Sequence, residues 1–367
     1  TFSLAPGSNA LPSGLTLTGS TGAITGQIAA NQDGVTTSVT FRLTDNTTGL
    51  FTDRDIDILG QSILYDFTSH TFTDAGAGAT RINKTDSDTG GWNAGPTLTQ
   101  LTTAYTPTWT DYTSNLNVTT QGIQEWTVPK TGSYTIKAAG AGGGYASSAA
   151  MRGIEMTGTF TLTMGATVRI IVGQSTPGGS GAATLASHGG GGGTFVYYNA
   201  TDTYPILAAG GGGGIWYAPG YDGSAFTASD GQSGTSGGAA RNATSAAPGA
   251  NGNGATGNGS YAGGGAGWLT DGSNGSLGPA SGGHAPRYGG EGGRTYQTAP
   301  GGFGGGGSTH GNHGGGGGGG GYSGGAAAPD GVYGGNSTNG HAGGGGSYGG
   351  TATGVYNQGQ GYVIITS

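Results

Sequence analysis

The sequence contains no cysteine among its 367 residues. Disulfides and thiolate chemistry are therefore excluded, although a secreted protein of this size does not need disulfides. Charged residues make up 8% of the chain, the net charge is −7, and no basic stripe is present. Because nucleic-acid binding requires cations that neutralise phosphates, we expect no nucleic-acid partner. No run of about 18 apolar residues occurs, so the sequence predicts no membrane span.

Glycine, in contrast, supplies 90 residues, well above its usual share of about 7%. Most of it lies between Gly140 and Gly350. Ordering a residue costs roughly 1–2 kcal/mol of backbone entropy, and glycine buries no side chain in return. Close-packed polyproline II helices, with three residues per turn, could order it through backbone hydrogen bonds between chains. The predicted glycine core consists of Gly314, Gly315, Gly316, Gly317, Gly318, Gly319, Gly320 and Gly321.

The alternative interpretation of this composition is a flexible linker. Three features favour order. Aromatic residues such as Phe303 and Tyr322 interrupt the glycine blocks, charge is sparse, and β-type sequence lies on both sides and within the first half of the region. We therefore predict a folded glycine-rich region that spans residues 140–350, with interleaved strands at 158–174 and 194–209.

Residues 1–60 alternate between apolar and polar positions and carry turn signals, which predicts short strands. The order of Phe2-Ser3-Leu4, Leu11–Leu17, Thr21–Gly26 and Phe41–Asp45 resembles the Ig- or cadherin-like modules of tandem surface proteins. The strand that this family places before Thr1 is missing. Either upstream sequence or a neighbouring subunit would supply it.

Residues 61–139 predict the first strands of a second sheet domain, including one over 63–68, and residues 351–367 predict its closing strand. In Ser133–Gly140, Tyr134, Ile136 and Ala138 face one side, as expected of a half-buried strand. One sheet should therefore contain strands from both ends of this region.

Several blocks from residue 121 onward occur in a recognisable order. They include Gln121–Pro129, Gly140–Gly143, Ile171–Gln174, Gly301–Gly307 and Gly314–Gly325. Together they are similar to the glycine-rich domain of the anaplastic lymphoma kinase and leukocyte receptor tyrosine kinases, a domain that also occurs in bacterial and phage surface proteins. The resemblance covers about residues 61–367. It implies a TNF-like β-jelly roll with an inserted bundle of polyglycine II helices, hence an all-β fold class after an Ig-like β-sandwich fragment. Because cysteines and a kinase are absent, it favours a phage or microbial surface setting.

The sequence shows no constellation that predicts an enzyme. His310 and His313 form the one close histidine pair, and a metal site would need more convergent ligands. Serines are numerous, but none lies in a Gly-x-Ser-x-Gly turn after a strand. A calcium site near Asp45, Asp53 and Asp55 is a weak candidate, and solvated strand charges are the alternative. We expect no other cofactor.

Aromatic side chains in the glycine-rich loops are the stronger functional signal. Loops on a rigid scaffold commonly carry binding, and Tyr and Trp suit sugar faces and protein contacts. Packing against the glycine helices is the alternative for each of them. The candidate ligand-binding residues are Trp216, Tyr217, Tyr221, Trp268, Tyr288, Tyr296 and Tyr333.

These observations predict a non-enzymatic extracellular protein of a virion or cell surface. The leading hypothesis is adhesion, as a phage tail-fibre tip or a cell-surface adhesin that recognises a host glycan or protein. The other hypothesis is a structural subunit of an extracellular filament or virion decoration, assembled by strand exchange. By analogy with TNF-like jelly rolls, a homotrimer is the expected form of self-association besides a filament.

Overall fold

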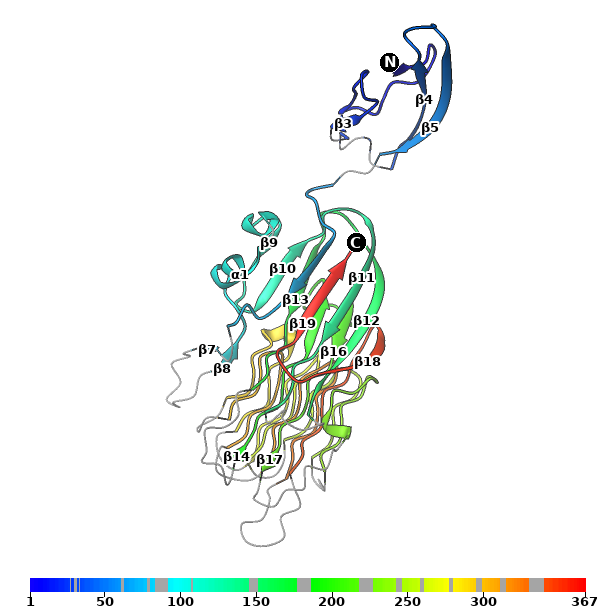
Figure 1. The fold of residues 1–367 in the computed structure, drawn as a ribbon. Coiled ribbons are helices and arrows are strands. Elements are labelled where there is room, and N and C mark those ends of the chain that lie inside the picture. Colours follow the sequence, from blue (N-terminus) through cyan, green and yellow to red (C-terminus); the bar gives the residue numbers. More distant parts are fainter. Residues whose placement is uncertain are drawn as a thin grey trace. The chain divides into compact units, whose positions relative to one another are not determined.

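The chain folds into two compact units in a computed structural model. One unit comprises Thr1–Asp66, Pro129–Thr131 and Thr163–Gly165, and the other comprises the remainder (Figure 1). The predicted boundary at residue 60 lies within the first unit. The structure describes residues 1–26, 28–29, 32, 34–60, 63–77, 80–82, 92–106, 108–144, 151–176, 186–217, 227–241, 246–257, 261–276, 280–294, 299–310, 315–329 and 340–367.

The first unit contains a three-stranded antiparallel sheet and a separate hairpin. The sheet has the order β1 (Phe2–Leu4), β4 (Thr36–Thr44), β5 (Phe51–Leu59), and the hairpin joins β2 (Leu15–Leu17) to β3 (Ile24–Gly26). In β4 the buried side chain of Val39 lies opposite Ile56 of β5. The alternation of the sequence thus predicted these strands.

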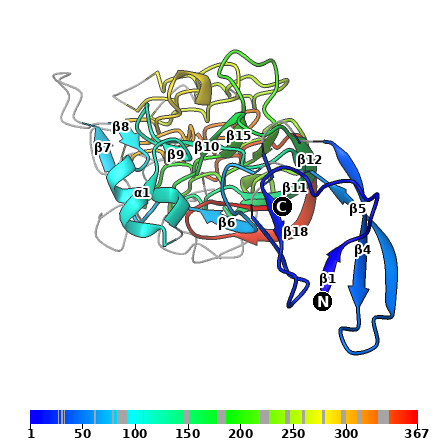
Figure 2. The same ribbon diagram turned by 90° about the horizontal axis from the view of Figure 1, so that it is seen from above.

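The second unit is built on two five-stranded sheets (Figure 2). The first sheet has the order β16 (Leu207–Ala209), β15 (Thr194–Tyr197), β13 (Thr167–Ile171), β10 (Ile123–Thr127), β9 (Leu116–Asn117). The second has the order β18 (Thr351–Asn357), β12 (Gly153–Leu162), β11 (Gly132–Ala139), β19 (Tyr362–Thr366), β6 (Ser69–Phe72). Since β19 lies between β11 and β6, strands from both ends of this region share one sheet, as predicted.

Shorter elements complete the second unit. They are β7 (Thr80–Ile82), β8 (Trp92–Ala94), α1 (Leu98–Ala104), η2 (Thr108–Asp111), β14 (Ala186–Ser187), β17 (Trp216–Tyr217), η3 (Thr227–Ser229) and η4 (Pro286–Tyr288). The strand predicted over 63–68 is wrong, because the described chain bends there and pairing begins at Ser69. The closing segment also differs, since two strands form where one was predicted. With one α-helix in its described part, the protein has the all-β fold that the sequence predicts.

Aromatic side chains fill the space between the two sheets. Trp126 of β10 points inward and meets Tyr134 of β11 edge to face, with ring centroids 5.8 Å apart. Phe67 and Phe72 approach Trp126 at 5.0 and 6.2 Å. Trp126 belongs to the first sheet, whereas Tyr134 and Phe72 belong to the second. These contacts therefore join the two sheets.

The glycine-rich region forms a bundle of extended segments below the sheets in Figure 1. At its centre, backbone amides that lie three residues apart within residues 316–321 donate to carbonyls that lie three residues apart in a neighbouring segment. The amides of Gly317 and Gly320 donate to His188 and Gly191 at 3.1 and 3.0 Å. The next residues on, Gly318 and Gly321, likewise donate to carbonyls three residues apart in another segment, Gly263 and Ala266. Because polyproline II-type helices repeat every three residues, this spacing is the one that a polyglycine II bundle requires.

Close packing explains why this region needs glycine. A Cβ atom added at Gly316, Gly317, Gly318, Gly319, Gly320 or Gly321 would lie 1.9–2.4 Å from a backbone atom of a neighbouring segment. Real Cβ contacts essentially never fall below 3.0 Å. Alanine therefore cannot occupy these positions unless a hydrogen-bonded neighbour moves. Of the predicted core, Gly315–Gly321 are buried, and Gly314 lies outside the described residues.

Candidate functional site

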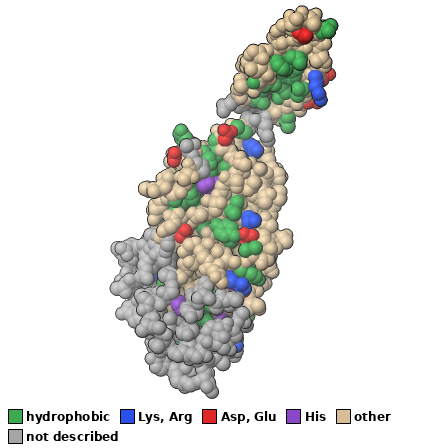
Figure 3. All heavy atoms as spheres, in the orientation of Figure 1, with side chains coloured by type: hydrophobic (Ala, Val, Ile, Leu, Met, Phe, Trp, Pro, Cys, Tyr) green, Lys and Arg blue, Asp and Glu red, His purple; other side chains and the backbone are tan. Residues whose placement is uncertain are grey.

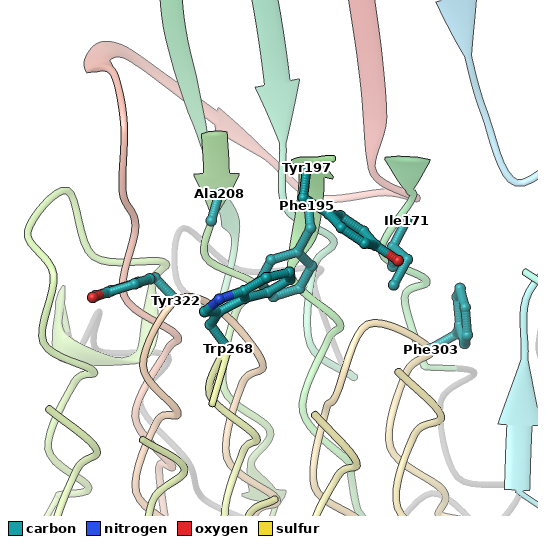
Figure 4. Packing of buried hydrophobic residues seen from close by; sticks show 7 residues of the cluster. All are labelled: Ile171, Phe195, Tyr197, Ala208, Trp268, Phe303 and Tyr322. Carbon is teal, nitrogen blue, oxygen red and sulfur yellow. The ribbon is translucent and has the colours of Figure 1, made fainter. Parts of the chain in front are cut away.

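Trp268, predicted to contact a ligand, is instead part of the buried core. Its side chain is fully buried, and its Nε1–H donates to the carbonyl of Asp202 at 3.0 Å. Its ring lies 5.1 Å from that of Tyr197 and 6.1 Å from that of Phe195, centroid to centroid. Figure 4 shows this cluster where the sheet strands meet the glycine segments. Ile171 of β13 and Phe195 of β15 are apolar side chains on the outer face of the sheet, and Trp268 packs with them in one buried cluster. Trp268 is therefore a packing residue.

The other aromatic candidates divide into four groups. Trp216 is 5% exposed in β17, so it too is corrected to a packing residue. The backbone of Tyr217 pairs with Ala186 in the same two-stranded sheet, and its side chain is outside the description. Tyr221, Tyr296 and Tyr333 lie outside the described residues. Tyr288, in contrast, is 63% exposed, so it is available to a ligand.

Tyr288 lines an open groove of about 540 Å³. The groove lies over the outer face of β10, β13 and β15, and the turn η4 forms its other wall. Its volume is typical of small-molecule sites, which span about 300–1,000 Å³. The lining residues are Thr119, Thr120, Ile123, Glu125, Arg169, Tyr197, Asn199, Ala200, Thr201, Pro286, Arg287, Tyr288 and Gly289.

Strand register places three polar side chains in one row along this groove. Glu125 pairs with Arg169, and Arg169 pairs with Tyr197, on adjacent strands. Because side chains directly opposite each other in a sheet share a face, all three point to the groove side. The Nε of Arg169 donates to Glu125 Oε1 at 3.1 Å, and its Nη1 donates to the carbonyl of Tyr198. The acid in the groove is thus neutralised by a neighbouring cation.

The opposite wall is fixed by a second arginine. Arg287 donates from Nε to the carbonyl of Ala200 at 3.0 Å and from Nη2 to the carbonyl of Asp202 at 3.4 Å. The loop that supplies these carbonyls is itself closed, because the amide of Asn199 donates to Asp202 Oδ2 at 2.9 Å. After Tyr288, Gly289 adopts a φ of 122°, a conformation that favours glycine. Tyr288 is therefore displayed on a well-supported turn.

Tyr197 contributes a buried hydroxyl to the groove wall. The residue is fully buried, and its Oη has no hydrogen-bond partner among the described atoms. Burial raises the pKa of this phenol, so it is a neutral donor at physiological pH. A buried hydroxyl without a partner costs about 1–3 kcal/mol, which a ligand oxygen could recover.

A second, more polar pocket of about 350 Å³ lies within the glycine-rich region. Its wall is held by local bonds, because Asp271 Oδ1 accepts from the amide of Ala285 at 2.7 Å and Asn274 Oδ1 accepts from the amide of Gly282 at 3.1 Å. The carboxylate of Asp271 and the amide of Asn274 therefore shape the pocket wall. None of its described lining residues was predicted as a ligand contact.

The predicted calcium ligands are separated by their own protein partners. Asp45 accepts from the amide of Thr47 and the hydroxyl of Thr48, and the first of these bonds is the main cause of its lowered pKa. Asp53 pairs with Arg42 at 2.8 Å, and Asp55 accepts from Thr40. Across the described residues, no group of three or more acidic or histidine side chains is placed to hold a metal ion. These aspartates are therefore corrected to strand and turn residues.

The histidines that the structure describes are not grouped into a metal site either. His188 and His341 are buried within the glycine bundle, and burial lowers the pKa of His188 to about 4. His284 lies 3.6 Å from Glu291, measured from Nδ1 to Oε2. His313 lies outside the described residues, so the predicted pair with His310 is not tested.

Sequence reasoning found Tyr288 but missed Glu125, Arg169 and Arg287. Alternation places Glu125 on the face opposite Trp126, which is a usable signal. Nothing in the sequence indicates that residues 125, 169 and 287 meet, because strand register and the course of the glycine loops bring them together. The missed residues are thus those that depend on long-range pairing.

Comparisons with known proteins found two similarities. Residues 1–56 match the family model described as "Putative Ig domain". An Ig-like domain begins the chain. The chain is also 38% identical over 99 residues to the leukocyte tyrosine kinase receptor of Mus musculus, a match that covers 25% of this chain. The match spans 11% of the receptor's length, so the chain corresponds to a small part of that protein. Within the described residues, no helix has the length and apolarity to cross a membrane.

Proposed function

We propose that this chain is a non-enzymatic recognition module of an extracellular or virion surface protein. The Ig-like domain at residues 1–56 and the similarity to part of a receptor support an extracellular, adhesion-type role. Within this role we infer a phage tail-fibre tip or a cell-surface adhesin that binds a host glycan or protein. The second unit would be a TNF-like jelly roll with a polyglycine II insertion, which fits its two sheets and the three-residue bonding repeat.

The groove beside Tyr288 is the observation that carries this proposal. It combines an exposed aromatic ring, an ion pair and uncharged polar side chains on a wall fixed by hydrogen bonds. Preorganised polar groups with an aromatic face favour binding because little freedom is lost when the ligand arrives. The glycine bundle supports the groove from below through the cluster around Trp268.

A binding function fits the chemistry of this groove better than catalysis. Glu125, the one acid among the described lining residues, is held in an ion pair with Arg169. The same set contains no histidine, aspartate or lysine. Among the lining residues, therefore, no general base stands beside a nucleophile, the arrangement that nucleophilic catalysis requires.

Two tyrosines of equal exposure provide the test. Tyr288 is 63% exposed in the groove, and Tyr112 is 64% exposed outside it. We expect Tyr288→Ala to reduce binding of the purified chain to whole host cells or to a glycan array at least tenfold, because an aromatic contact is removed. Tyr112→Ala should bind like the parent chain. Equal binding by both variants would place the recognition surface elsewhere.

A structural subunit is the second candidate, and one strand favours it. β5 lies at an edge of its sheet and is exposed over almost its whole length, and exposed edges can pair with another chain. Three aspartates and Arg54 on this strand weigh against it, because edge charges hinder such pairing. Negative-stain imaging separates the candidates: long polymers would support the filament, whereas monomers or homotrimers would support the recognition module.

A further inference from the structure

Arg287 brings a positive charge to the groove, and no acid among the described residues forms an ion pair with it. Its described hydrogen bonds go to two backbone carbonyls, those of Ala200 and Asp202. Of the ion pairs formed by the described residues, none includes Arg287, and its Nη1 group makes no described hydrogen bond. Carbonyls hold the guanidinium in place without cancelling its charge. It is therefore positioned to receive an anion.

The charge of the groove is opposite to that of the chain. Arg169 and Glu125 offset each other across the sheet, which leaves Arg287 as the uncompensated charge of the lining. The chain as a whole carries a net charge of −7. Its overall field thus repels anions, and an anion would bind here through local geometry rather than through bulk attraction. A guanidinium suits a carboxylate because its planar donors match the two oxygens.

The remaining lining favours a sugar over a free anion. Tyr288 presents an exposed ring next to Arg287, and an aromatic face packs well on the apolar face of a pyranose. Thr119, Thr120 and Asn199 add neutral hydroxyl and amide groups for sugar hydroxyls. The buried Oη of Tyr197, which lacks a described partner, offers one more donor.

We propose that this groove binds an acidic sugar, with the carboxylate on Arg287 and the pyranose ring on Tyr288. This inference rests on the proposed recognition function and names its ligand class. The shared chemistry is a sugar carboxylate, which occurs in both uronic and sialic acids. Lining by tyrosine, threonine and asparagine gives the sugar ring its contacts, and Arg287 gives selectivity for the acid.

The test changes the charge of the ligand before it changes the protein. A glucuronic acid-containing tetrasaccharide and 3′-sialyllactose are titrated into the intact chain by calorimetry, each beside its methyl ester, with lactose and inorganic phosphate as further probes. We expect at least one acidic sugar to bind about tenfold or more tightly than its ester, because a charge-assisted hydrogen bond is lost. The preferred acid identifies the source as uronic or sialic.

Variants then locate the effect. Arg287→Gln should remove the preference for the acid over its ester, whereas Arg54→Gln on β5 should retain it. Tyr288→Ala should weaken both forms of the sugar. Equal binding of acid and ester, or an undiminished preference in Arg287→Gln, would overturn the acidic-sugar inference and leave the recognition function standing. If inorganic phosphate competes as well as the sugar does, the groove is a site for free anions, and the acidic-sugar inference is overturned as well. Unchanged cell binding by Tyr288→Ala would instead refute the proposal that this groove is the recognition surface.

Discussion

Gly318 offers the sharpest test of close packing in the glycine bundle. A Cβ atom at this position would lie 1.9 Å from the carbonyl oxygen of Gly325 and 2.6 Å from the amide nitrogen of Gly265. These two neighbours are joined by a hydrogen bond of 3.0 Å. Relief of the clash requires a backbone shift of roughly 1 Å. The Gly318→Ala variant must therefore distort this hydrogen bond or move an entire segment.

The expected cost follows from two effects. Overpacking of a dense interior costs about 1–3 kcal/mol, and a buried backbone group that loses its partner costs about 1–3 kcal/mol more. We therefore expect Gly318→Ala to lower the free energy of unfolding by about 4 kcal/mol. Gly234 provides the matched control, because a Cβ there meets nothing within 4 Å. Gly234→Ala should lie within about 1 kcal/mol of the parent chain.

Urea unfolding followed by tryptophan fluorescence measures this difference. All five tryptophans lie in the second unit, so the signal reports that unit and not the Ig-like one. The Gly318→Ala midpoint should fall well below that of Gly234→Ala. Equal midpoints for the two variants would refute the close-packing argument, because they would mean that the bundle accepts a methyl group at its centre.

Three further predictions use the same assay. Trp268→Ala should lower the free energy of unfolding by about 3–5 kcal/mol, because it removes a fully buried ring and the hydrogen bond to the carbonyl of Asp202. A decrease no larger than that caused by Tyr112→Ala would contradict the packing role of Trp268. Asp230→Ala should lower the free energy of unfolding by about 3 kcal/mol, because this buried carboxylate accepts three hydrogen bonds from Arg152. An unchanged unfolding midpoint would show that the ion pair is dispensable for stability. Burial lowers the pKa of His70 and of His188 to about 4 in the folded chain. Below about pH 6.5 these histidines take up protons in the unfolded state but not in the folded state. The free energy of unfolding should therefore be highest above that pH. Between about pH 6.5 and pH 4, each histidine should lower it by about 1.4 kcal/mol for each pH unit. His70→Phe should remove its own share of this slope, and a pH-independent midpoint between 4 and 6.5 would contradict the assignment.

The strands of both units were largely predictable because their signal is local. Tyr134, Ile136 and Ala138 alternate with polar residues, and the structure buries all three in β11. Residues 63–68 carry apolar side chains as well, yet Ile63 and Leu64 are exposed and the chain bends there. An apolar run indicates a strand only when a neighbouring strand is available to pair with it. That condition depends on the tertiary fold and cannot be read from the run itself.

The candidate site was less predictable for the same reason. Trp268 and Tyr288 look alike in the sequence, since each interrupts a glycine-rich stretch. They differ because Trp268 covers the apolar side chains of Ile171 and Phe195, whereas Tyr288 is the last residue of the turn η4 beside the groove. Arg169 and Arg287 lie far apart in the chain. They line one groove because the strand register positions Arg169 and the path of the loops positions Arg287. The sequence alone therefore predicts an aromatic contact residue, but it does not identify the charged residues that surround it in the groove.

Amide hydrogen exchange across residues 317–321 tests the central claim most directly, namely that the glycine run is the ordered core of a folded unit. Each amide from Gly317 to Gly321 donates to a carbonyl of another segment at a distance of 2.9–3.2 Å. We expect these amides to exchange at least about 1,000-fold more slowly than unstructured glycine, as hydrogen-bonded core amides do. The exposed amide of Gly234 should exchange rapidly in the same sample. Uniformly fast exchange from Gly317 to Gly321 would contradict the account.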